Sequence, residues 1–422
     1  MTGDGQWILR GGAGVYANWL TQANVQEEFR GNPPGLILPT FFEGSSTPPR
    51  FVQGSSSTPP FGFAFPPLAG SALCPSAPCL DAKGGVAGAA FPIGGINPEL
   101  KSPTAYIFVT TLEHQIRSNL SGSIIYSGSH STNQVGNGNQ AGLVSYGVNI
   151  NSFAGDLLNK PAGSAPTRLN PSFGSIAYAA NDRVANYNGV TFDLRGRSHG
   201  VFFDVSYTRS SSKDDMGTGG TGGGLAYPTS IDPHQYYGPS PWDAPHRLSL
   251  TFNYTVPDRT SSGALLNQLA SGWGVSGIGI YQSGYPLTVW TTAPFTAGGD
   301  YNADGDNLDY PNVTNYNMRR SFDDYLKNGV FTAGQFTAPA PGTEGNERPQ
   351  QFRQPNFAET DLSIYKNTKL LTGVSLQIRL EFYNIFNNKN LYLENDLSSG
   401  GFGKAISQQL PRWWQIGARL TF

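Results

Sequence analysis

Apolar and polar side chains alternate with a period of two along many segments of this chain. The regularity is clearest in the segment 246–256. One set there is Leu248, Leu250, Phe252, Tyr254 and Val256, and the other is Arg247, Ser249, Thr251, Asn253 and Thr255. Successive side chains of a β-strand point to opposite faces. The segment therefore predicts a strand with one apolar and one polar face.

The same reading predicts ten strands. They lie at about 7–16, 104–117, 119–129, 186–194, 199–210, 246–256, 273–290, 357–366, 375–386 and 412–422. Within 273–290 the period slips near Ser276 and Gly277, which predicts a bulge or a glycine kink. Charged side chains such as Arg379, Glu381 and Arg419 recur on the polar faces, where a dry core would require many partners. A polar face toward a wet lumen and an apolar face toward lipid is the pattern of an antiparallel transmembrane β-barrel.

The connections between these strands alternate between short and long. Long loops are expected at about 18–103, 130–185, 211–243 and 291–356, with a further one before the last strand. Outer-membrane barrels have short periplasmic turns at one end and long extracellular loops at the other. The alternation favours an all-β membrane barrel over the alternative, a large glycine-rich soluble β-protein.

Composition agrees with this fold class. Only 13% of the residues are charged, 12% are aromatic, 53 are glycine, and the mean hydropathy is −0.32. No run of about 18 apolar residues occurs, which excludes a transmembrane helix from the sequence. The net charge of −2 gives no reason to expect a nucleic-acid partner.

The end of the chain, 361–422, resembles the end of TonB-dependent outer-membrane receptors. The similarity rests on Asp-Leu-Ser-Ile-Tyr-Lys at 361–366, Arg-Leu-Glu-Phe-Tyr-Asn-Ile-Phe-Asn at 379–387 and the terminal Phe422. Among these receptors, the segment is similar more specifically to the Oar-like group, whose N-terminal domain is of the carboxypeptidase-regulatory type. Segments at 5–14, 186–190, 199–208, 245–250 and 283–289 are similar to the same group in the same order. Each motif is weak alone, and their order is the specific part.

The resemblance implies a place in the outer membrane, in contact with lipid and lipopolysaccharide. TonB-dependent transporters are plugged barrels of about 22 strands. Residues 1–422 are therefore expected to form one unit, the C-terminal part of such a barrel, and to lack the signal peptide, plug and TonB box. The complete protein would bind or take up an unidentified substrate and would meet the TonB system only through the missing plug. Phe422 resembles the signal read by the barrel-assembly machinery.

Two other functions remain open at this point. The chain could be a self-contained ten-stranded pore or adhesin. It could also be a barrel-borne hydrolase, although no clustered Asp, His and Ser set supports an enzyme. The run from Gly196 to Gly200 formally matches the Gly-x-Ser-x-Gly elbow, which requires a strand before it and a helix after it. Because a predicted strand follows Gly200, the run is interpreted as a hairpin turn.

Three further features concern ligands and charges. Asp300, Asn302, Asp304 and Asp306 place oxygen ligands at alternate positions around a glycine, as in the first half of a calcium loop. The last position of such a loop would be Pro311 instead of glutamate, so a solvated acidic turn is the alternative.

Cysteines occur twice, in the run Cys-Pro-Ser-Ala-Pro-Cys. Cys74 and Cys79 are expected to pair as a disulfide in an oxidising compartment, and the alternative is a pair of free thiols. Carboxylates on the predicted lumenal face, such as Asp204 and Glu381, are expected to pair with arginines such as Arg247 and Arg379. They could also line a substrate path.

Overall fold

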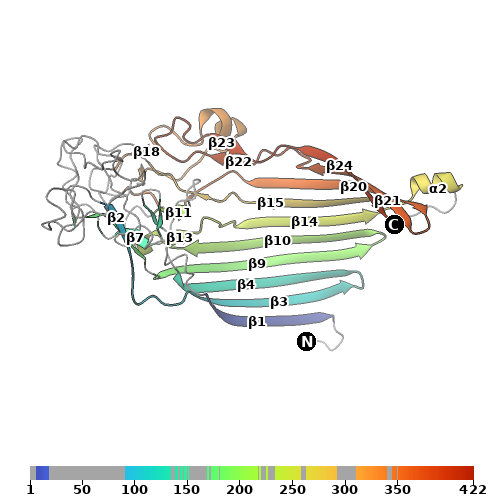
Figure 1. Ribbon diagram of the computed structural model, residues 1–422, viewed down its shortest axis with the longest axis horizontal. Coiled ribbons are helices and arrows are strands. Elements are labelled where there is room, and N and C mark those ends of the chain that lie inside the picture. Colours follow the sequence, from blue (N-terminus) through green and yellow to red (C-terminus); the bar gives the residue numbers. More distant parts are fainter. Residues whose placement is uncertain are drawn as a thin grey trace, which may run out of the picture.

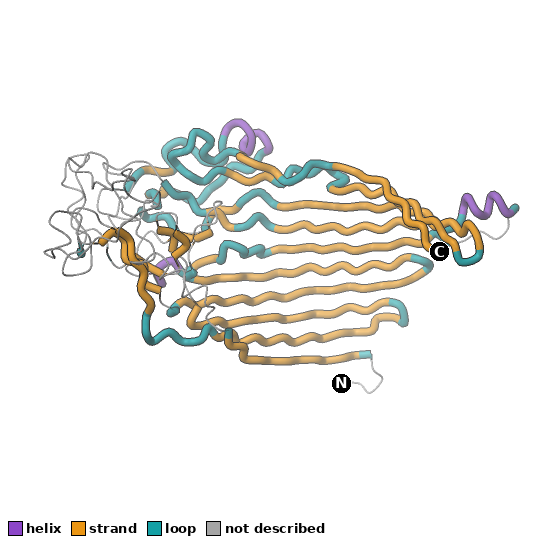
Figure 2. Tube along the Cα trace, in the orientation of Figure 1, coloured by secondary structure: helices purple, strands orange, loops and turns teal. Residues whose placement is uncertain are grey.

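The computed structural model describes residues 6–18, 91–134, 138–291 and 310–422, with short gaps in the last two ranges. These gaps are 141–142, 146, 150, 152–168, 171–172, 180, 217, 220–224, 227–232, 258–262, 340–344 and 349. The main feature is one antiparallel sheet whose strands lie side by side in the order β1-β3-β4-β9-β10-β14-β15-β20-β21-β24 (Figures 1 and 2). The predicted all-β, ten-stranded fold is confirmed.

Long strands make up this sheet. They are β1 (Trp7–Ala17), β3 (Thr104–Arg117), β4 (Leu120–Gln134), β9 (Arg183–Ser198), β10 (Val201–Asp214), β14 (His246–Thr255), β15 (Trp273–Gln282), β20 (Phe357–Leu371), β21 (Val374–Tyr383) and β24 (Trp413–Thr421). The short strand β13 (Gly238–Pro239) pairs with the end of β10. Among the described residues β1 pairs only with β3, and β24 pairs only with β21. The sheet therefore has two edges.

The strand register confirms the two faces that the alternation predicts. Leu250 lies opposite Val205 on one neighbour and Gly279 on the other, whereas Thr251 lies opposite Asp204 and Ile278. We call the first side the apolar face and the second the polar face. The apolar face stays uncovered: no second sheet packs on it in the described part of the chain, and Ile416 is 69% exposed.

Tight hairpins join neighbouring strands at one end of the sheet. In the turn between β9 and β10, His199 has φ 47° and Gly200 has φ 80°, the left-handed geometry of a two-residue hairpin. The predicted turn at Ser118 joins β3 to β4. A short helix, α2 (Ala264–Ala270), lies in the connection from β14 to β15 at this same end (Figure 1). None of the helices among the described residues has the length and hydropathy that crossing a membrane requires.

The predicted bulge near Ser276 and Gly277 is wrong. β15 pairs in unbroken register with both β14 and β20. The apparent slip has another cause: Gly277 lies on the apolar face beneath the ring of Phe252, while Ile278 lies on the polar face. An aromatic ring over a cross-strand glycine fills the space that the glycine leaves on the face.

Two predicted strands end earlier than expected. β15 stops at Gln282 instead of continuing to residue 290, and the chain then leaves the sheet. β21 stops at Tyr383 because Asn384 takes φ 48° and its carbonyl accepts the backbone N–H of Asn387 in a turn.

The long connections lie at the opposite end of the sheet, and two of them fold into a small unit that we call the cap. The cap consists of 284–291, 310–356 and 384–412. Its elements are β16 (Pro286–Leu287), β17 (Asn312–Val313), η3 (Asp324–Asn328), β18 (Phe336–Thr337), β19 (Phe352–Arg353), β22 (Leu391–Leu393) and β23 (Ala405–Gln408). The described residues of the expected loop at 291–356 therefore belong to this folded unit.

The cap has a hydrophobic core of its own. The core contains Leu287, Val289, Val313, Val330, Phe331, Phe352 and Leu393, with Phe336 and Phe402 packed against it. Phe331 stacks on Phe402 with ring centroids 4.9 Å apart. The remaining short elements are β2 (Phe91–Ile96), β5 (Gly138–Gln140), β6 (Leu143–Ser145), β7 (Gly147–Asn149), β8 (Phe173–Ala179), β11 (Thr218–Gly219), β12 (Leu225–Ala226) and η2 (Pro233–Tyr236).

Candidate functional site

Several residues singled out by the sequence fall outside the described part of the chain. These are the calcium-loop residues Asp300, Asn302, Asp304 and Asp306, and the cysteines Cys74 and Cys79. The calcium site and the disulfide therefore stay predictions. Within the described residues, no group of three or more His, Cys, Asp or Glu side chains is arranged to hold a metal ion. Phe422 follows β24 directly and is 94% exposed.

Ion pairs cross the polar face of the sheet. Asp204 accepts from Arg195, with 2.8 Å between Oδ2 and Nη2, and Glu381 lies 3.6 Å from Arg379. The expected pairing of Glu381 with Arg379 is confirmed. Asp204 also pairs with an arginine of the polar face, as expected, and this arginine is Arg195, which lies directly opposite it in the register of β9 and β10. Arg247 lies opposite Thr208 and Gln282, and no described carboxylate pairs with it.

The Gly-x-Ser-x-Gly run forms the hairpin that the sequence predicted. Ser198 ends β9, and its Oγ lies 2.7 Å from Nδ1 of the adjacent His199. β10 begins at Val201, so a strand follows the turn where a nucleophile elbow would have a helix. The run is a structural turn at the short-connection end of the sheet.

A pocket of about 280 Å³ lies where the cap meets the polar face. β14, β15 and β20 contribute the ends of their polar faces, and the cap contributes the segments 354–356, 390–392 and Gln409. The lining residues are Arg247, Ile280, Gln282, Gly284, Tyr285, Gln354, Pro355, Asn356, Phe357, Asn390, Leu391, Tyr392 and Gln409. A concave site with mixed apolar walls and convergent polar groups is the usual form of a small-molecule site. This pocket is the candidate functional site.

Hydrogen bonds fix the polar side chains around the pocket. Gln282 Oε1 accepts from Arg247 Nη1 at 2.6 Å, and Gln354 Oε1 accepts the backbone N–H of Leu393 at 2.9 Å. Asn390 is held on both sides, because its amide accepts from Ala358 N and donates to Ala358 O. Each bond ties a cap residue or a strand end to its neighbour, so the pocket is held in shape by polar contacts.

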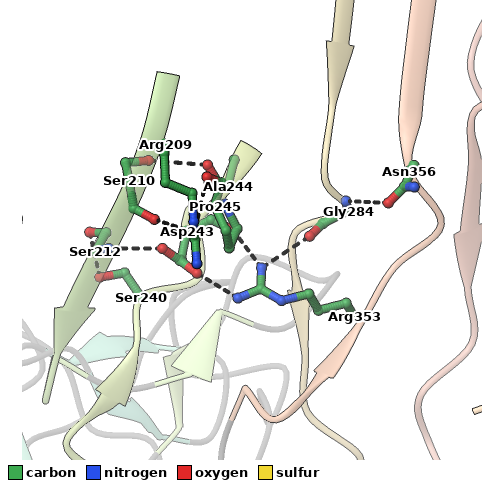
Figure 3. Close-up of polar contacts among 10 residues, drawn as sticks. All are labelled: Arg209, Ser210, Ser212, Ser240, Asp243, Ala244, Pro245, Gly284, Arg353 and Asn356. Atoms are coloured by element: carbon green, nitrogen blue, oxygen red, sulfur yellow. Dashed lines mark hydrogen bonds and ion pairs between the residues drawn. The ribbon is translucent and has the colours of Figure 1, made fainter. Parts of the chain in front are cut away.

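An ion pair joins the cap to the loop before β14, next to the pocket (Figure 3). Arg353 Nη2 lies 2.5 Å from Asp243 Oδ2, and Arg353 also donates to the carbonyl oxygens of Asp243 and Gly284. The other carboxylate oxygen of Asp243 accepts the backbone N–H of Ser212 at 2.8 Å. Asp243 is 4% exposed. A single carboxylate thus links β10, the loop before β14 and the cap.

Asp243→Ala is expected to loosen the cap by about 2 kcal/mol, because it leaves the half-buried guanidinium of Arg353 without its carboxylate and the backbone N–H of Ser212 without an acceptor. The readout is the rate at which trypsin cleaves the cap of the folded chain in lipid vesicles. The matched control is Asp323→Ala, which removes an exposed ion pair to Lys327 and should cost less than about 0.5 kcal/mol. Equal cleavage rates for the two variants would contradict the role of the Asp243 tether.

A second polar cluster lies inside the cap. Glu347 is 3% exposed, and its Oε1 accepts the backbone N–H of Val289 at 2.9 Å, while its Oε2 has no hydrogen-bond partner among the described residues. Gln350 and Asn395 bind the neighbouring residue Thr288. Burial raises the pKa of the Glu347 carboxyl well above its ordinary value of 4.5.

Protonation of Glu347 should therefore make cap stability depend on pH. The folded cap holds the proton more tightly than the unfolded chain, so the free energy of unfolding falls as pH rises from about 4.5 to the raised pKa. Glu347→Gln, which carries no titratable group, should remove this decline, whereas Asp323→Asn should retain it. Cap proteolysis measured from pH 5 to pH 8 tests the prediction, and a decline that persists in Glu347→Gln would contradict it.

Comparison with known proteins identifies the chain's family. A family model described as "Outer membrane beta barrel domain" matches residues 1–415. The chain belongs to this family. This family places the protein in the outer membrane, where an uncovered apolar face is expected of a barrel strand.

Solved structures of outer-membrane transporters and of a receptor are similar to this chain. The outer membrane transporter YddB from Escherichia coli matches with 9% identity and a TM-score of 0.42, over 78% of this chain and 34% of that one. The FrpB iron transporter from Neisseria meningitidis matches with 10% identity and a TM-score of 0.38, over 78% and 33%. The ferripyoverdine receptor of Pseudomonas aeruginosa matches with 14% identity and a TM-score of 0.34, over 76% and 27%.

This chain thus spans about a third of the length of the solved structures it matches. No curated protein matches it.

Sequence reasoning missed the candidate site. Gln354, Asn356 and Asn390 were expected to lie in generic loops or strand ends, and Arg247 was expected to be neutralised by a carboxylate. One signal was present: the run Gln-Phe-Arg-Gln-Pro-Asn at 351–356 concentrates amide side chains just before β20. The alternation of strands says nothing about which loops fold back over a strand end, so this run could not be placed.

Proposed function

We propose that this chain is the outer-membrane wall and the extracellular cap of a TonB-dependent type of receptor. The pocket between the polar face and the cap carries the proposal, because it opens where a substrate arriving from outside would first meet the lumen. A receptor needs such a site at its outer mouth, held by rigid elements. The pocket's walls are strand ends of β14, β15 and β20, and the Asp243–Arg353 pair holds the cap beside them.

The wider assembly is part of the same proposal. The chain would form the C-terminal part of a barrel of about 22 strands, and a plug domain would deliver the TonB-linked energy. The exposed Phe422 at the end of β24 would be read by the barrel-assembly machinery. The Oar-like group is the narrower assignment, supported by the order of the sequence motifs from 5–14 to 361–422.

A metabolite comparison in the source bacterium tests receptor function even though the substrate is unidentified. Spent medium would be compared by mass spectrometry for three strains: the parent, a strain lacking this gene and a strain lacking TonB. At least one compound that the parent consumes should remain in the medium of both deletion strains. If every compound left by the gene deletion is consumed normally without TonB, energised uptake by this protein is excluded.

Orientation is tested separately. An epitope inserted at Gly400, an open position in the cap, should bind antibody on intact cells. The same epitope inserted in the connection 258–262 between β14 and α2 should bind only after the outer membrane is opened. Antibody binding to intact cells at the second position alone would reverse the assignment of the two ends.

A further inference from the structure

Within the described residues, the hydrogen bonds leave three amide groups of the pocket lining with unused donors, whereas Gln409 donates its NH₂ to the hydroxyl of Tyr392 at 2.9 Å. The amide oxygens of Gln282 and Gln354 are occupied by Arg247 and by the backbone N–H of Leu393. The amide oxygen of Asn356 accepts the backbone N–H of Gly284 at 3.2 Å (Figure 3). Because guanidinium and backbone N–H groups can only donate, these contacts fix each amide with its oxygen toward the protein.

The NH₂ groups of these three amide side chains remain available to a ligand. Within the described part of the chain, none of the NH₂ groups of Gln282, Gln354 and Asn356 has a hydrogen-bond acceptor, and none is sealed from solvent. Arg247 uses one of its nitrogens for Gln282 and retains further N–H groups. A pocket lined by unused donors favours a ligand rich in acceptors.

The charge of the lining indicates an anion. Arg247 is the single charged residue among those that line the pocket, and no described carboxylate neutralises it. Three other arginines of the polar face, Arg10, Arg195 and Arg379, each face a carboxylate. Arg197 lies over the ring of Phe202 instead, and neither it nor Arg419 lines the pocket. One uncompensated positive charge matches one negative charge, and the planar guanidinium matches the two oxygens of a carboxylate. A phosphate dianion would leave one charge unbalanced.

The other walls indicate the rest of the ligand. Ile280, Phe357 and Leu391 supply apolar surface, and Tyr285 and Tyr392 supply rings with a polar tip. Apolar surface next to donors suits an organic acid whose carbon skeleton is buried while its carboxylate meets Arg247. A free inorganic anion would leave these walls without a partner.

We propose that this pocket binds the carboxylate of a small organic acid, with Arg247 and the NH₂ groups of Gln282, Gln354 and Asn356 as donors. The inference deepens the proposed receptor function, on which it rests, by naming the substrate class. Arg247 lies at the outer end of β14 and would contact the ligand before it enters the lumen.

Binding of benzoate to the full 422-residue chain, folded in detergent micelles, tests the proposal by calorimetry and ligand-observed NMR. Benzoate should bind at least about tenfold more tightly than the isosteric neutral benzamide, because a charge-assisted bond is lost in the amide. Arg247→Gln should weaken benzoate binding by about tenfold or more, and Arg247→Lys should weaken it less. The matched control is Arg197→Gln, which should leave binding unchanged. Arg197 is also on the polar face, but it lies beside the β9–β10 hairpin, at the end of the sheet away from the pocket.

A second variant guards against misfolding of Arg247→Gln. Gln354→Glu keeps the acceptor for Leu393 N–H but adds a negative charge to the pocket, and it should also weaken benzoate binding by about tenfold. The proposal is overturned if neither variant weakens benzoate binding, if the chain binds no benzoate, or if phenyl phosphate binds more tightly than benzoate. A failure of these tests leaves the metabolite comparison unaffected, so the two proposals fail separately.

Discussion

Leu250→Arg is expected to destabilise the folded barrel by about 2–4 kcal/mol, because it places a charge on the lipid-facing side near the middle of the membrane. Leu250 is the fifth residue of the ten-residue strand β14 and lies opposite Val205 and Gly279. All three positions belong to the apolar face. The introduced guanidinium would have lipid around it and no carboxylate within the register.

The measurement is the free energy of unfolding in guanidinium chloride, for the chain folded into lipid vesicles. The matched control is the next residue, Thr251→Arg, whose side chain points to the polar face. Thr251 lies opposite Asp204 and Ile278, so the new charge would meet water and a carboxylate and should cost less than about 1 kcal/mol. If both variants are equally destabilised, or only the control is, the two faces have been assigned in reverse.

The second large effect is expected for Phe352→Ala, which should unfold the cap and leave the sheet intact. Phe352 is 1% exposed, and its ring lies 5.1 Å from that of Phe331 and 5.6 Å from that of Phe336. Removing a buried aromatic ring typically costs about 3–5 kcal/mol, through lost burial and the cavity that remains. The cap core is small, so a loss of this size is a large part of what holds it together.

Limited proteolysis in lipid vesicles, combined with circular dichroism, distinguishes unfolding of the cap from unfolding of the sheet. For Phe352→Ala, trypsin should cleave at Arg319, Arg320 or Arg348 much faster than in the parent chain, while far-ultraviolet circular dichroism should keep the β signal. Phe322→Ala serves as the control, since Phe322 is 48% exposed and lies outside the core. Unchanged cleavage in Phe352→Ala would show that the cap does not depend on its aromatic core.

The sheet could be predicted from the sequence because each of its strands separates two solvents. From Arg247 to Thr255 in β14, every apolar residue faces one side and every polar residue the other, so the alternation alone predicted the strand and its faces. The method failed where that rule relaxes. In β15, Gly277 on the apolar face and Ile278 on the polar face mimic a change of period, although the register is unbroken.

The cap and its pocket could not be predicted in the same way. Val289, Val313, Val330 and Phe352 form its core but come from separate loop segments, singly and without a period. The buried state of Glu347 depends on which segments fold over it, and no local pattern encodes that. Arg247 has no carboxylate partner among the described residues because its cross-strand neighbours are Thr208 and Gln282, and the alternation of polar and apolar residues does not encode which strands become neighbours.

The two edges of the sheet have a consequence for how the protein exists in a membrane. Along the outer sides of β1 and β24, alternate residues turn their amide hydrogens and carbonyl oxygens away from the described neighbours. Water forms hydrogen bonds with such groups in solution, but in hydrocarbon each group without a hydrogen-bond partner costs several kcal/mol of free energy. Each edge strand can therefore form backbone hydrogen bonds with another strand, which is either the opposite edge strand of the same sheet or a strand of further polypeptide. Hydrogen-bond pairing along the outer sides of β1 and β24, more than any side-chain contact, therefore decides when the sheet becomes stable in lipid.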